Sequence, residues 1–144
     1  MCCVWLLGAT GQLGQVICHF DKSNQKVIFQ SDISQKEKVK EWLSVGNHDS
    51  IVVNVAAMTA VDGCEADECR AFEVNALGPK YLAENVARQG GTLLHVSTDY
   101  VFPGTDPTPR KETDPVCPIN AYGRTKWAGE VFVRAICPKH YIVR

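Results

Sequence analysis

Short apolar segments alternate with segments of helical pattern along this 144-residue chain, and this alternation limits the folds it can adopt. The expected strands are short and apolar, and they cover residues 3–7, 26–30, 50–56, 92–96 and 141–143. The expected helices cover residues 35–44, 64–89 and 121–135, and Gly78-Pro79 predicts a kink or break in the second of them. Strands that alternate with helices predict a parallel sheet with helices on both faces. We therefore expect an α/β fold with one doubly wound sheet.

Three glycines with two residues between each pair, Gly8, Gly11 and Gly14, follow the first expected strand and precede a helix. In such a turn the first glycine allows a tight bend, the second lets a pyrophosphate approach the backbone, and the third lets helix and strand pack closely. The helix N-terminus offers N–H groups and a positive dipole end to phosphates. The alternative is an ordinary strand-to-helix turn. The position after a buried N-terminal strand favours dinucleotide binding and a Rossmann-type sheet.

An acidic residue about 20 positions after such a turn is the expected partner of the adenine ribose. Asp32 lies 18 residues after Gly14 and just beyond the second expected strand. Asp21 is a second candidate, but it lies nearer the end of the first helix. No arginine stands next to Asp32 in the sequence to hold a 2′-phosphate. The sequence therefore permits NAD and leaves NADP open.

Tyr122 and Lys126 lie four residues apart in the last expected helix, which places them on one helix face. A free tyrosine has a pKa of about 10, too high for a proton shuttle at neutral pH. A cation nearby favours the phenolate and lowers that pKa, so the spacing suits a general acid or base. The same spacing also occurs on solvated helix faces.

Four further stretches show a resemblance to a known family: 54–62 (NVAAMTAVD), 74–79 (VNALGP), 97–104 (STDYVFPG) and 120–126 (NAYGRTK). Together with the glycine turn, which precedes the Tyr–Lys pair by about 110 residues, they resemble the extended short-chain dehydrogenases/reductases. Within that branch the resemblance is to the dTDP-4-dehydrorhamnose reductases. It extends over nearly the whole chain.

The resemblance implies roles for individual residues of the catalytic and substrate sites. Thr98 would bind the substrate carbonyl oxygen, and Tyr122 would protonate that oxygen as hydride arrives at the carbon. Lys126 would lower the tyrosine pKa and hold the nicotinamide ribose. Asp99 would contact the nucleotide-sugar together with Thr98 and Tyr122.

The resemblance also implies a set of residues that contact NADP or NAD at the pyrophosphate, the adenine end or the nicotinamide. They are Gly8, Thr10, Gly11, Gln12, Leu13, Gly14, Asp32, Ile33, Ala56, Ala57, Met58, Thr59, Val96, Tyr122 and Lys126.

The implied activity is NAD(P)H-dependent reduction of the 4-keto group of a dTDP-4-dehydro-6-deoxy sugar, which converts dTDP-4-dehydrorhamnose to dTDP-rhamnose. The alternative is a non-catalytic NAD(P)-binding regulatory protein similar to the regulatory β subunit of methionine adenosyltransferase. Members of the family continue well beyond the position of Arg144. We therefore expect residues 1–144 to form an NAD(P)-binding Rossmann domain, truncated before the small substrate-binding domain. Such a domain would have an unprotected sheet edge.

Composition limits the setting in which this chain acts. The net charge is −1 and no basic run is long enough for a nucleic-acid or membrane surface. The seven cysteines are scattered without the spacing of a metal site, so we expect no metal and free thiols in a reducing cytoplasm. The expected partner is a dTDP-sugar. Two modes of assembly stay open, a homodimer and pairing through the incomplete sheet edge.

Overall fold

The computed structural model describes residues 3–21, 26–45, 50–105 and 107–144. Cys2, one of the seven cysteines, lies outside these ranges. Within them, five strands form one parallel sheet in the order β2-β1-β3-β4-β5. The strands are β1 (Val4–Leu7), β2 (Lys26–Phe29), β3 (Ile51–Asn54), β4 (Thr92–Val96) and β5 (His140–Val143).

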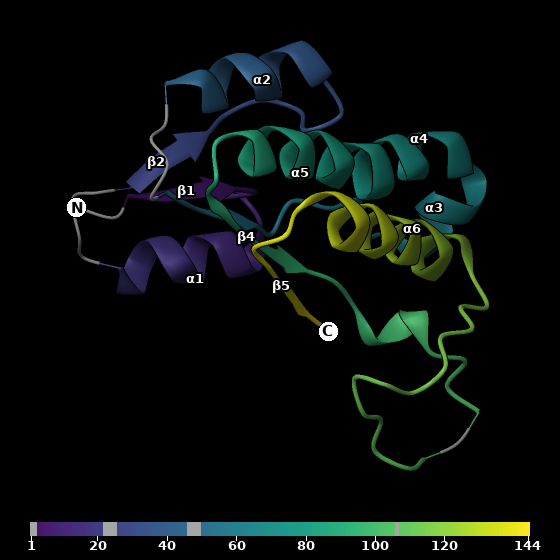
Figure 1. The fold of residues 1–144 in the computed structure, drawn as a ribbon. Helices are drawn as coiled ribbons and strands as arrows, with labels where there is room; N and C mark the ends of the chain where they lie inside the picture. Colours follow the sequence, from purple (N-terminus) through teal and green to yellow (C-terminus); the bar gives the residue numbers. More distant parts are fainter. Residues whose placement is uncertain (1–2, 22–25, 46–49, 106) are drawn as a thin grey trace.

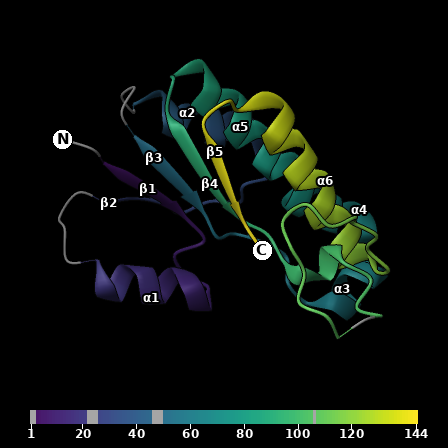
Figure 2. The ribbon, with the colours of Figure 1, turned by 60° about the horizontal axis from the view of Figure 1, so that its bottom comes forward.

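Helices cover both faces of this sheet (Figures 1 and 2). Helix α1 (Gln12–Phe20) lies on one face, while α2 (Lys36–Ser44), α5 (Gly78–Arg88) and α6 (Ala121–Ile136) lie on the other. This arrangement confirms the expected doubly wound, Rossmann-type α/β fold. None of the helices in the described ranges is both long and apolar enough to cross a membrane.

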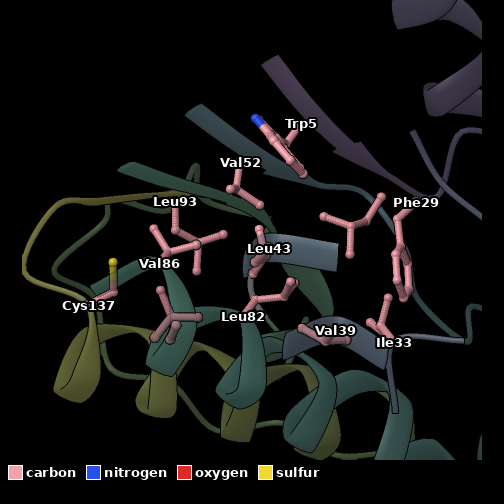
Figure 3. Close-up of a cluster of buried hydrophobic side chains, with 13 residues drawn as sticks. Trp5, Phe29, Ile33, Val39, Leu43, Val52, Leu82, Val86, Leu93 and Cys137 are labelled. Atoms are coloured by element: carbon pink, nitrogen blue, oxygen red, sulfur yellow. The ribbon is translucent and has the colours of Figure 1, made fainter. Parts of the chain in front are cut away.

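The core lies between the sheet and the helices α2 and α5, which cover one of its faces (Figure 3). Alternate strand residues point into it, because side chains of a strand alternate between the two faces of the sheet. From the strands come Trp5, Leu7, Phe29, Val52 and Leu93, and from the helices come Val39, Leu43, Leu82 and Val86. Burial of each such side chain contributes about 1.5–3 kcal/mol of transfer free energy. This core fixes β1 and β3, whose carboxyl ends carry the loops of the candidate site.

The expected helix at 64–89 is divided into several helical segments. They are α3 (Val61–Ala66), α4 (Glu68–Phe72), a π-helical turn η1 (Glu73–Leu77) and α5. The division between α3 and α4 falls at Asp67, whose side chain accepts a hydrogen bond of 2.9 Å from the N–H of Arg70. At Gly78-Pro79 the backbone stays helical, with φ −54° and ψ −56° at Gly78. A proline in the first turn of a helix needs no N–H partner there, so Pro79, the second residue of α5, fits without the predicted break.

Candidate functional site

A groove of ≈ 1490 Å³ runs along the carboxyl ends of the strands. Strand order reverses between β1 and β3, and ligands of doubly wound sheets bind at such a point. Every residue expected to contact the coenzyme lines this one groove, from Asp32 after β2 to Lys126 on α6. Thr98 and Asp99 lie outside the lining. The fold therefore gathers the expected coenzyme residues, while their roles stay a prediction.

Two of the three glycines are required by backbone packing. Gly8 has φ +86°, and a Cβ there would lie 2.6 Å from the backbone nitrogen of Ala56. A Cβ on Gly14 would lie 2.1 Å from the carbonyl oxygen of Gly8. At Gly11 the closest atom to an added Cβ is that same oxygen, at an ordinary 3.4 Å. Packing therefore does not require a glycine at position 11. The missing side chain leaves room in the groove for a phosphate to approach the backbone.

A second set of contacts fixes the loop after β3, which lines the groove with Ala56, Ala57, Met58 and Thr59. Buried Asn75 holds Met58 by accepting from its N–H at 2.9 Å and donating to its carbonyl oxygen at 3.0 Å. The same amide group donates to the Thr125 hydroxyl at 3.2 Å. Asn75 therefore ties this loop to helix α6, on which Tyr122 and Lys126 lie.

Helix α6 begins at a capped turn that positions Tyr122. The Asn120 side chain accepts from the N–H of Gly123 at 2.7 Å, which is an ordinary N-cap. Tyr122 is nearly buried and hydrogen-bonds the side chain of Thr98. The Thr98 hydroxyl also accepts from the N–H of Tyr100 at 3.2 Å and donates to the Asp99 carboxylate at 3.2 Å.

Lys126 lies on the same helix and is only 2% exposed. Its ammonium Nζ donates to the carbonyl oxygen of Val96 at 2.7 Å, at the end of β4. Burial lowers the pKa of Lys126 to about 8, and the carboxylate of Glu130 opposes this shift. The structure thus brings Thr98, Tyr122 and Lys126 together where β4 ends.

The pKa of Tyr122 departs from its ordinary value in the direction opposite to the one expected from the Tyr–Lys spacing. Burial raises it, the hydrogen bond with the Thr98 side chain lowers it, and the nearby acidic groups of Cys64, Asp99 and Tyr100 raise it again. The Lys126 ammonium bonds the Val96 carbonyl oxygen, while desolvation dominates at the phenol. A raised pKa keeps the phenol protonated at neutral pH.

Behind Lys126 lies a buried charge network that the sequence analysis did not single out. Glu130 is fully buried and accepts from the Ser97 hydroxyl at 2.6 Å. Arg144 donates to both carboxylate oxygens, from Nη2 at 2.8 Å and from Nε at 3.0 and 3.3 Å, and Arg134 donates at 3.3 Å. Burial raises the pKa of Glu130, but these bonds outweigh it and hold the pKa below its ordinary value. The network anchors the residue before Thr98 and places a negative charge one turn from Lys126.

A second missed residue lies at the opposite end of the groove. Arg70, on α4, forms an ion pair with Asp32 and lines the groove beside it. No arginine adjoins Asp32 in the sequence, but the fold brings one there from 38 residues away. No sequence spacing could have signalled this contact, whereas Glu130 lies four residues after Lys126 and was detectable from the helical period.

Comparison with known proteins places this groove in context. A dTDP-4-dehydrorhamnose reductase of Salmonella typhimurium is 38% identical over 149 residues, which cover 98% of this chain and 50% of the relative. One from Mycolicibacterium smegmatis is 39% identical over 145 residues, covering 96% and 43%. The chain spans about half the length of the curated relatives it matches.

The chain is also similar to solved structures of dTDP-4-dehydrorhamnose reductases. The crystal structure of a dTDP-4-dehydrorhamnose reductase from Clostridium acetobutylicum superimposes with a TM-score of 0.91 at 40% identity, covering 100% of this chain and 52% of that one. The reductase of Bacillus anthracis, in complex with NADP, gives a TM-score of 0.91 at 34% identity, covering 98% and 52%. These similarities confirm the resemblance expected from the sequence motifs. The family model described as the RmlD substrate binding domain matches residues 2–144, and the chain belongs to this family.

Proposed function

We propose that this chain is the coenzyme-binding and proton-donating part of an NAD(P)H-dependent reductase. The substrate of this reductase is a dTDP-4-dehydro-6-deoxy sugar, whose 4-keto group is reduced. The reaction converts dTDP-4-dehydrorhamnose to dTDP-rhamnose. The observation that carries the proposal is the single groove that joins the glycine turn to Tyr122 and Lys126. Residues 1–144 form the NAD(P)-binding Rossmann domain, which acts in the cytoplasm on a dTDP-sugar.

The groove residues fit a dinucleotide. Gly11, at the N-cap of α1, has no side chain to fill the space a pyrophosphate needs or to accept from the first-turn N–H groups. Asp32 and Arg70 offer polar contacts to the adenine ribose, and the backbone-anchored loop at Met58 offers an apolar wall. At the other end, Tyr122 and Lys126 stand where a nicotinamide and its ribose would lie.

When bound, NADPH or NADH supplies the hydride for the keto carbon. The Thr98 hydroxyl holds the carbonyl oxygen, and the Tyr122 phenol gives its proton to that oxygen, so that the ketone becomes an alcohol. At its ordinary pKa of about 10 a phenol is already protonated at neutral pH, and the upward shift in the pKa of Tyr122 leaves it in this state, which the step requires. The Lys126 ammonium, held by the Val96 carbonyl oxygen, stabilises the phenolate left behind, until solvent returns the proton.

The substitution Tyr122→Phe tests this assignment. It removes the proton donor and leaves the ring, so kcat for NADPH oxidation with dTDP-4-dehydrorhamnose should fall by about 10²–10⁴-fold, the usual contribution of general acid catalysis. The Kd for NADPH should change less than about threefold. Tyr81→Phe, which removes the same hydroxyl from α5 outside the groove, is the matched control. Equal activity of wild type and Tyr122→Phe would refute the role of Tyr122.

The regulatory alternative predicts coenzyme binding without turnover. The relatives and solved structures described above carry the names of reductases. These similarities favour the reductase over the regulatory protein.

A further inference from the structure

Two charges of opposite sign meet at the adenine-ribose end of the groove. Asp32 follows β2, Arg70 comes from α4, and both line the groove. One terminal nitrogen of the Arg70 guanidinium pairs with Asp32, and the other donates to the Ser34 hydroxyl at 2.9 Å and to Glu73 at 2.9 Å. The side chains of Asp32 and Arg70 are 30% and 39% exposed, so a ligand in the groove can reach both.

The Asp32 carboxylate is held in one orientation. Its Oδ1 atom accepts from the backbone N–H of Ser34 at 2.9 Å and from the Ser34 hydroxyl at 2.8 Å. Burial raises the pKa of Asp32, but the bonds from Ser34 and Arg70 outweigh it and hold the pKa below its ordinary value. An ionised, oriented carboxylate accepts hydrogen bonds from a ribose 2′-hydroxyl, as NADH requires. The same carboxylate repels the 2′-phosphate of NADPH.

Arg70 has the opposite effect on coenzyme choice, because it favours NADPH over NADH. A guanidinium is planar, permanently charged and well matched to a phosphate through paired N–H bonds. The bond to Glu73 holds the guanidinium at the groove wall without help from Asp32. A 2′-phosphate can therefore replace Asp32 as the acceptor for Arg70 without moving the helix that carries it. The alternative is that this exposed ion pair has only a structural role and links α4 to the loop after β2. Such a pair contributes about 0–1 kcal/mol to the free energy of unfolding.

We infer that Arg70 is the residue that admits the 2′-phosphate of NADPH, and that its ion pair with Asp32 sets the ratio of NADPH to NADH affinity. The inference rests on the proposed coenzyme-binding function of the groove. It assigns opposite effects to two residues in contact. Loss of Arg70 weakens NADPH binding, whereas loss of the Asp32 charge weakens NADH binding and relieves the repulsion of the phosphate.

Calorimetric titration of the chain with NADPH and with NADH, at one fixed salt concentration, tests it. In Arg70→Gln the affinity for NADPH falls by about tenfold or more, because one charge-assisted contact to the phosphate is lost. The affinity for NADH changes less than about threefold. In Asp32→Asn the NADPH-to-NADH affinity ratio rises by about tenfold. Arg88→Gln, which removes a guanidinium from the end of α5 outside the groove, leaves both affinities unchanged.

Equal weakening of both coenzymes by Arg70→Gln, or an unchanged ratio in both variants, would overturn the inference and leave Arg70 a purely structural ion pair. Arg70→Lys keeps a charge without the planar fork and should lie between wild type and Arg70→Gln, so it carries the test together with Asp32→Asn should Arg70→Gln not fold. Wild type that binds neither coenzyme would instead refute the proposed function itself.

Discussion

Lys126 is a buried cation, and its burial makes the stability of this protein depend on pH. The pKa of Lys126 is lowered from an ordinary 10.5 to about 8. Between these values the unfolded chain keeps the proton that the folded chain has lost, so stability rises as pH rises through this window. The lysine destabilises the fold most at neutral pH, where the buried group is charged.

Substitution of Lys126 by methionine should therefore reveal a pH-dependent difference. Urea unfolding at pH 7 and at pH 9 should show that wild type gains about 1 kcal/mol relative to Lys126→Met over this interval, since one pKa unit corresponds to about 1.4 kcal/mol. A difference between the two proteins that stays constant with pH would show that Lys126 is not buried as a cation.

We expect Glu130 to act on the proposed reaction through Lys126, as a positioning residue. Its carboxylate raises the pKa of Lys126, so Glu130→Gln should lower that pKa further. The rate of reduction should then decline at a lower pH than in wild type, since the charged lysine is lost earlier. The alkaline limb of the kcat profile measures this.

Arg134→Gln removes an exposed partner of the same carboxylate and is the control for Glu130→Gln. It should leave the alkaline limb in place. A purely structural role for Glu130 would lower kcat at every pH and would not move the limb.

Some residues of the candidate site could be predicted from the sequence, and others could not. The Tyr122–Lys126 spacing and the glycine turn were readable, because helical period and turn geometry are local properties. The direction of the Tyr122 pKa was not, because it depends on burial and on the groups around the phenol. Arg70 was equally hidden, since its contact with Asp32 exists only after β2 and α4 come together.

The glycine turn is the element on which we expect coenzyme binding to depend most directly. In Gly14→Ala the new Cβ would lie 2.1 Å from the carbonyl oxygen of Gly8, and only a backbone shift of α1 away from β1 can relieve this. We expect a loss of about 1–3 kcal/mol in unfolding free energy, typical of overpacking, together with weaker NADPH binding. Thermal unfolding and coenzyme titration measure the two effects.

Gly63→Ala provides the matched control within α3. A Cβ there meets side-chain atoms of Ala60 and Met58 at 3.3 and 3.5 Å. Alanine also has the higher helix propensity, so this variant should be neutral or slightly stabilised. Similar losses in both variants would show that close packing at Gly14 is not the cause.

Element boundaries followed from local pattern where a segment has one clear face. Strand β4 covers the predicted residues 92–96, and α6 begins at the predicted Ala121. The region 61–88 did not follow in the same way. Its real division at Asp67 depends on one capping side chain, and its π-helical turn lies where Asn75 meets α6. A Cβ on Gly129 would lie 2.3 Å from the Asn75 carbonyl oxygen, so the turn depends on tertiary packing.

At the scale of the molecule, the alternation of strands and helices predicted a parallel, doubly wound sheet, and this is confirmed. The strand order β2-β1-β3-β4-β5 places the glycine turn and the loop after β3 side by side. Residues 8–14 and 56–59 therefore line one groove with Tyr122 and Lys126, although these segments are far apart in sequence. The arrangement of the proposed coenzyme site is a consequence of topology, while its chemistry depends on a few side chains.

In the proposed function, this groove directs hydride to a sugar ketone and Tyr122 supplies the proton. The most direct measurement uses NADPH that carries deuterium at the transferred position, with dTDP-4-dehydrorhamnose as substrate and mass spectrometry of the product. We expect wild type to form dTDP-rhamnose with one deuterium at the sugar C4, and Tyr122→Phe to form about 10²–10⁴-fold less of it. Binding of NADPH by the wild-type chain without deuterium transfer to the sugar would contradict the proposed function.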